Sequence, residues 1–173
     1  GDHRDLHLSI RRQRKMCIRD RLTLENVKVP SSCLLGSEDQ GFQLLEDAID
    51  NATLAICAEA VGAMEVLYKT TVEYSKTREQ FGQPIGKFQV LQHRMVDMFM
   101  EYEQSKSLLY MATIKNVEGS QDAKKSISGL KYQVGKAAKF IGQQSVQLHG
   151  GMGVTDELNV GLSLIHISEP TRR

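Results

Sequence analysis

Three stretches of helical periodicity, separated by short breaks, most constrain what this chain can fold into. Apolar residues recur every three or four positions over residues 41–76, 88–117 and 123–148, the spacing of one face of an α-helix. The breaks between these stretches hold glycine, proline and polar residues, which interrupt helices. Long helices with short connections pack beside one another. The sequence therefore predicts an all-α fold, an up-and-down bundle of three long helices.

The second and third predicted helices each carry one apolar seam, spaced in steps of four and three, as in helices that pack nearly antiparallel. In the second helix the seam is Leu91, Met95, Met98, Tyr102, Ser105, Leu109 and Ala112. In the third helix it is Ile127, Leu130, Val134, Ala137, Ile141, Ser145 and Leu148. We interpret the methionines as core-filling residues, because their flexible side chains adapt to irregular gaps.

The first predicted helix differs because it carries two apolar stripes. The main stripe is Leu45, Ala48, Ile49, Ala52, Ile56, Ala60, Ala63 and Leu67. The second stripe is Leu54, Cys57, Ala58, Val61, Tyr68 and Val72. A helix that is apolar on more than one side is usually buried. We therefore expect this helix to lie at the centre of the bundle, with neighbours around much of its girth.

The segments outside the helices are less regular. Residues 1–21 are mostly polar or charged, and residues 22–29 alternate in a pattern that predicts a short strand ending at Pro30. A loop of small and polar residues then leads to the first helix. Residues 162–173 do not continue a helical pattern after the third helix. The bundle is thus expected to lack a full fourth helix.

Composition excludes several classes of function. The formal net charge of +1 provides no field that would attract nucleic acid or an acidic membrane surface. Cys17, Cys33 and Cys57 form no CxxC pair and no Cys/His spacing typical of a metal site, which favours a reducing compartment. No apolar run approaches the roughly 20 residues that span a bilayer. We predict neither a metal site nor membrane insertion.

Two segments break the helical regularity in a way that packing does not require. In TREQFGQPIGKFQVLQH, Arg78 and Gln80 flank a turn that contains Phe81, so a guanidinium, an amide and an aromatic ring lie beside glycine backbone. This combination suits a phosphate or a planar ring system. In QLHGGMG, glycines follow His149 at a helix C-terminus, whose carbonyl groups repel phosphate and favour a base or sugar.

The run TREQFGQPIGKFQVLQH, followed a helix later by VQLHGGMGVTDE, resembles the paired flavin-contact signatures of the acyl-CoA dehydrogenase family. The preceding LTLENVKVPSSCLLGSEDQGFQLLEDAIDNATLAICAEAVGAM is similar to that family's junction between its middle strand domain and its C-terminal bundle. The resemblance covers residues 22–161 and is nearest to the bacterial pimeloyl-CoA dehydrogenase small-subunit type. It implies a four-helix bundle whose last helix is truncated here.

The resemblance also divides the chain and names its cofactor. It implies that residues 22–40 are a remnant of the middle β domain with its linker and that residues 41–161 are the C-terminal helical domain. KMCIRDR and SLIHISEPTRR are similar to translated sequencing-adapter sequence, so we expect residues 1–21 and 162–173 not to be native. The implied cofactor is FAD. Its implied contacts are Arg78, Gln80, Phe81, Gln89, Gln147, Leu148, His149, Gly150 and Gly151.

Within that set, the resemblance places Arg78, Gln80 and Phe81 on the pyrophosphate side of FAD. Gln89 would add an amide contact, and residues 147–151 would enclose the adenosine end. In the family these contacts reach the flavin of a neighbouring subunit, which implies a homodimer, a homotetramer or a related heteromer. An electron-transfer acceptor and a bacterial cytoplasmic location are also implied.

The implied reaction is the α,β-dehydrogenation of an acyl-CoA thioester to a trans-2-enoyl-CoA. The base that removes the α-proton is a carboxylate in the family, and it belongs to a segment beyond the glycines that this chain does not match. We therefore assign no catalytic residue and expect this chain alone to be inactive. Two alternatives remain, a non-catalytic subunit that contacts FAD in a heteromer and a helical scaffold without a cofactor.

Overall fold

The computed structural model describes residues 25–155 and 160–161. The chain divides into two units after Leu34. In the first unit, the described residues form a short 3-10 helix at Ser31–Cys33. Residues 25–29 form no strand, so this part of the strand expected at residues 22–29 is wrong, and residues 22–24 lie outside the described residues. A strand needs a hydrogen-bonded partner, and this segment has none among the described residues.

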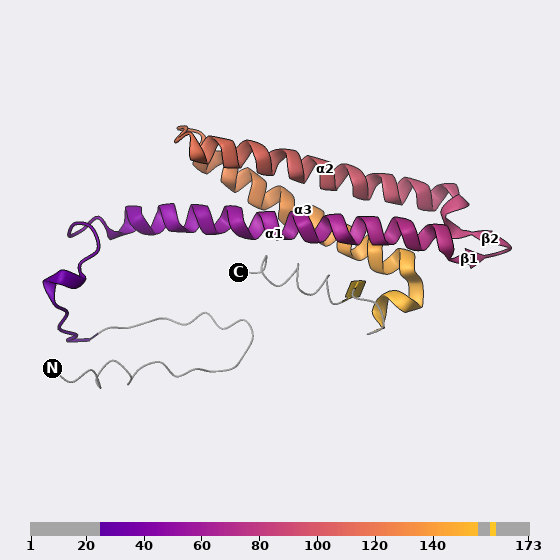
Figure 1. The fold of residues 1–173 in the computed structure, drawn as a ribbon, viewed down its shortest axis with the longest axis horizontal. Helices are drawn as coiled ribbons and strands as arrows, with labels where there is room; N and C mark the ends of the chain where they lie inside the picture. The colour runs from indigo at the N-terminus through magenta and orange to yellow at the C-terminus, as the bar shows by residue number, and fades with distance from the viewer. Residues whose placement is uncertain (1–24, 156–159, 162–173) are drawn as a thin grey trace. The chain divides into compact units, whose positions relative to one another are not determined.

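Three helices make up most of the described part of the second unit (Figure 1). Helix α1 is Gly41–Thr77, α2 is Gln89–Val117 and α3 is Ala123–His149. Strands β1 (Glu79–Gln80) and β2 (Gln83–Pro84), followed by a 3-10 helix at Ile85–Lys87, connect α1 to α2. The predicted all-α bundle and its three helices are confirmed.

Helix α3 is the most buried of the three and packs extensively against both α1 and α2. Its buried face includes the small residues Ala137, Ala138, Gly142 and Ser145, which let the neighbouring helices approach closely. The predicted seam of α3 is buried along its whole length. Met98 and Tyr102 of α2 are buried against it, and the other seam residues of α2 are buried or partly buried. Both predicted seams are therefore confirmed.

The predicted central position of α1 is wrong, because one side of α1 is exposed while part of its second stripe faces the core. Leu54, Cys57 and Val61 are buried, and burial raises the pKa of the Cys57 thiol. Leu45, Ile49 and much of the rest of the main stripe are exposed. Periodicity shows that a helix has apolar faces but does not show which face meets a neighbour. The central helix is α3, not α1.

Polar contacts near the start of α1 hold this helix to α2 and α3. The Asn116 side chain of α2 donates a 3.0 Å hydrogen bond to Asn51, and Lys124 of α3 forms a 2.8 Å ion pair with Glu46. At the other end, α1 is followed by the hairpin while α3 ends in glycines. Both predicted ligand segments therefore lie at the same end of the bundle. No helix among the described residues is long and apolar enough to cross a membrane.

Candidate cofactor site

The first predicted segment forms a β-hairpin with a two-residue turn. Strands β1 and β2 are antiparallel, with Glu79 opposite Pro84 and Gln80 opposite Gln83. Phe81 and Gly82 form the turn and have φ values of 54° and 77°. Positive φ at both central residues matches the right-handed twist of paired strands. Gly82 adopts a positive φ readily, but a residue as large as Phe81 is unusual in the left-handed region.

The hairpin is anchored to both adjacent helices. The Arg78 amide donates to the Tyr74 carbonyl at 2.9 Å, and the Ile85 amide donates to the Arg78 carbonyl at 2.8 Å. Gln92, near the start of α2, donates through Nε2 to the Gly86 carbonyl at 2.9 Å. These bonds join the hairpin and the loop after it to the end of α1 and the start of α2. The position of Arg78 is thus fixed by the end of α1.

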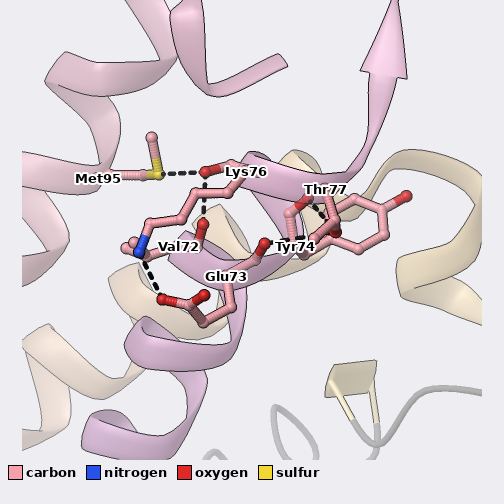
Figure 2. Close-up of polar contacts among 7 residues, drawn as sticks. Val72, Glu73, Tyr74, Lys76, Thr77 and Met95 are labelled. Carbon is pink, nitrogen blue, oxygen red and sulfur yellow. Dashed lines mark hydrogen bonds and ion pairs between the residues drawn. The ribbon is translucent and has the colours of Figure 1, made fainter. Parts of the chain in front are cut away.

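Ser75 links the end of α1 to α2 through Met95, which Figure 2 labels. Its hydroxyl donates to the Val72 carbonyl at 2.7 Å and contacts the Met95 sulfur at 3.3 Å. The loop passes so close to this point that a Cβ on Gly86 would lie 3.0 Å from both the Ser75 carbonyl oxygen and its hydroxyl. Only glycine allows this approach without a shift of the backbone.

The second predicted segment is fixed by His149 at the end of α3. His149 is buried, with 4% of its surface exposed, and its Nδ1 lies 2.8 Å from the Ser145 carbonyl oxygen. Because a carbonyl only accepts, Nδ1 carries the proton in this bond. Gly150 follows with φ 61° and ψ −138°, and its amide donates to the Gln147 carbonyl. A side chain at Gly150 would be strained, so glycine turns the chain immediately after His149.

The two segments meet across the end of the bundle. The ring of Tyr74 in α1 stacks on the imidazole of His149, with centroids 4.3 Å apart and planes inclined by 29°. Beside this pair lies a cavity of about 400 Å³. Its lining residues are Tyr74, Arg78, Gln80, Ile85, Gln147, Leu148, His149, Gly150, Gly151 and Met152. The cavity therefore brings the arginine segment and the glycine segment together.

Two of the predicted site residues do not line this cavity. Phe81 is 91% exposed at the hairpin tip, where its ring meets Phe88 edge-on with centroids 6.1 Å apart. Gln89 is exposed at the first position of α2. The other predicted contacts all line the cavity. Phe81 and Gln89 are instead placed to meet a group outside it.

Three lining residues, Tyr74, Ile85 and Met152, were not predicted. Tyr74 resembles an ordinary apolar position of a long helix, and its role is visible only from its contact with His149 in a distant helix. Ile85 and Met152 immediately adjoin the glycines of the two segments. Their closeness to the motifs was the one signal in the sequence that could have identified them.

The two sides of the cavity offer different groups to a ligand. Arg78 forms no ion pair with any residue that the structure describes, so its guanidinium is available to an anionic group. Gly150 and Gly151 have open space where a side chain would project, so their backbone can approach a flat ring or a sugar.

Across residues 25–155 and 160–161, no three His, Cys, Asp or Glu side chains gather to hold a metal ion.

Known proteins are similar to this chain in sequence. Residues 39–166 match the model of the acyl-CoA dehydrogenase C-terminal domain. The short-chain-specific acyl-CoA dehydrogenase of Megasphaera elsdenii is 34% identical over 139 residues, which are 80% of this chain and 36% of that protein. The mitochondrial 2-methylacyl-CoA dehydrogenase of Solanum tuberosum is 33% identical over 140 residues, 81% of this chain and 34% of that protein.

The fold is shared with solved structures as well. PigA with FAD and proline superposes with a TM-score of 0.81 at 32% identity, over 86% of this chain and 38% of that one. The chain thus spans about a third of the length of relatives that it matches. The matching helices, the paired motifs and the domain model agree, and the chain belongs to the acyl-CoA dehydrogenase family, within the region of its C-terminal domain.

Proposed function

We propose that this chain supplies FAD contacts and a subunit interface to an acyl-CoA dehydrogenase. The observation that carries the proposal is the cavity at the end of the bundle, which arginine and glycine segments about 70 residues apart line together. A scaffold without a ligand would need neither a guanidinium without an ion pair among the described residues nor a turn that only glycine adopts without strain. The family's FAD-bound relative PigA supports the choice of cofactor.

The residues fit the two chemically different ends of FAD. Arg78 offers a planar cationic fork for the diphosphate, and Gln80 beside it offers an amide. Gln147, Gly150 and Gly151 offer backbone and amide groups for adenosine at a helix C-terminus, where a phosphate would be repelled. Bound FAD would supply the acceptor for a hydride from the acyl β-carbon. We also propose that the C-terminal helical domain begins at Gly41.

A neighbouring subunit would complete the site. Phe81 is 91% exposed at a hairpin tip, so apart from its edge-on contact with Phe88 the ring is open to another molecule. Large apolar side chains also lie exposed along α1 and α2, and patches of this kind mark protein interfaces. On α1 they include Phe42, Leu45, Ile49, Ile56 and Val66, and on α2 Val96, Phe99, Tyr110, Ile114 and Val117.

The substrate would be an acyl-CoA thioester, oxidised between its α and β carbons. The α-proton requires a base, and no aspartate or glutamate lines the described cavity. We therefore place the base elsewhere in the complete protein. A complete protein without that carboxylate would have the second function, a non-catalytic subunit that contacts FAD in a heteromer.

Arg78→Gln in the full-length protein tests the proposal. Because hydrogen bonds to charged groups contribute about 1.5–3 kcal/mol, FAD should bind roughly 10- to 150-fold more weakly, measured by titrating apoprotein and following flavin fluorescence. Lys87→Gln is the matched control, since Lys87 is exposed on the same loop but does not line the cavity. A wild-type protein that binds no FAD, or an equal loss in both variants, would contradict the proposal.

A further inference from the structure

Tyr74 occupies the junction between the two halves of the cavity. Its carbonyl accepts hydrogen bonds from the Arg78 amide at 2.9 Å and from the Thr77 hydroxyl at 3.2 Å, so its backbone fixes the point where α1 ends. Its ring stacks on His149 and lines the cavity. One residue therefore contacts the arginine segment through its backbone, as Figure 2 shows for the Thr77 hydroxyl, and the glycine segment through its side chain.

The Tyr74 ring restricts His149 to one orientation. The bond from Nδ1 to the Ser145 carbonyl fixes one edge of the imidazole, and the stack at 4.3 Å fixes its face. With Nδ1 donating to this carbonyl, Nε2 is the remaining polar atom of the ring. Nε2 has no hydrogen-bond partner among residues 25–155 and 160–161. The ring is thus held in place with one polar atom still available.

The backbone transmits this constraint to the glycines. Gly150 follows His149 directly and adopts φ 61° and ψ −138°, a conformation restricted to glycine. Because glycine has no side chain to make contacts, the position of this turn depends on the residues on either side. Gly153 supports the far side, because a Cβ there would lie 2.7 Å from the Val146 carbonyl oxygen. His149 supports the near side.

We propose that Tyr74 is a positioning residue of the cofactor site. Its ring holds the His149 imidazole and the Gly150–Gly151 turn where they receive the cofactor. This inference rests on the proposed function of the cavity. The ring supplies the effect, so a phenylalanine can replace the tyrosine. The Tyr74 hydroxyl has no hydrogen-bond partner within the described part of the chain.

Two substitutions separate the ring from the hydroxyl. Tyr74→Leu in the full-length protein removes the stack, which is worth about 0.5–1.5 kcal/mol for aromatic pairs, so FAD affinity should fall roughly two- to tenfold. Tyr74→Phe should restore wild-type affinity. Tyr132→Leu is the control, because Tyr132 is a tyrosine of α3 that is 76% exposed and does not line the cavity. If Tyr74→Leu does not fold, Tyr74→Met replaces it.

A double-mutant cycle distinguishes positioning from general destabilisation. If Tyr74 acts through His149, the leucine substitution should lower FAD affinity in the wild-type background but add nothing in a His149→Leu background. The NMR signals of the His149 ring should also lose the ring-current shift in Tyr74→Leu and keep it in Tyr74→Phe. Additive effects on affinity, or unchanged affinity in Tyr74→Leu, would overturn the inference while wild-type binding still supports the cofactor site. Absence of wild-type binding would overturn both.

Discussion

Phe81 stands at the tip of the β1–β2 hairpin with φ 54°, a region that large side chains rarely enter. The neighbouring Gly82 adopts its φ of 77° without cost. Strain of this kind concentrates at functional sites, where the rest of the fold maintains it. The exposed ring is therefore better explained by a contact with a ligand or a second subunit than by the stability of the hairpin.

Replacing Phe81 should separate stability from binding. In Phe81→Asn, the free energy of unfolding should stay the same or rise by up to about 1 kcal/mol, because asparagine tolerates the left-handed region better than phenylalanine. FAD affinity should fall, because the exposed aromatic contact is lost. Chemical denaturation and FAD titration of the full-length variant measure the two effects. A clear loss of stability without a loss of affinity would show that Phe81 serves the fold.

The helices α1, α2 and α3 follow from periodicity and from the glycines and prolines between them. The seams of α2 and α3 could be predicted because one stripe in each of these helices recurs in regular steps of four and three. Helix α1 has two, and its buried side depends on contacts of Leu54 and Cys57 with residues far along the chain. The arginine and glycine motifs predicted most of the cavity, whereas Tyr74 could not be identified before the helix ends were seen to meet.

The close approach of Gly86 to Ser75 leads to a prediction about the loop that carries Arg78. Gly86→Ala places a methyl group 3.0 Å from the Ser75 carbonyl oxygen, so the loop or α1 must shift. Overpacking of this kind costs about 1–3 kcal/mol. Thermal unfolding should show lower stability, and FAD affinity should fall with it.

Gly62→Ala is the matched control. Gly62 lies within α1, and nothing stands within 4 Å of the position that its Cβ would occupy. Alanine is favoured over glycine inside a helix, so this variant should gain about 0.5–1 kcal/mol of stability. Equal behaviour of the two variants would mean that the loop does not pack against Ser75 as closely as described.

At the scale of the whole molecule, we propose that the exposed apolar stripe of α1 is the surface for subunit association. Ile56 is 41% exposed and Val66 is 64% exposed on this helix. Ile56→Glu combined with Val66→Glu should place charge in an interface while leaving the buried stripe intact. The full-length variant should remain helical by circular dichroism but show a smaller mass by sedimentation.

Gln121→Glu provides the control for added charge, because Gln121 is exposed in the connection between α2 and α3. It should keep the oligomeric state of the wild type. If the double α1 variant also keeps that state, then α1 does not form the interface. In that case the apolar stripe must be covered by another part of the same subunit.

We propose that the cavity at the end of the bundle receives FAD. A crystal structure of the full-length protein with FAD would locate the cofactor. We expect the diphosphate within hydrogen-bond distance of the Arg78 guanidinium, and the adenosine against Gln147 and the Gly150–Gly151 turn, with Tyr74 still stacked on His149. FAD bound in the crystal with both segments of this cavity free of it would show that the cavity is not the cofactor site.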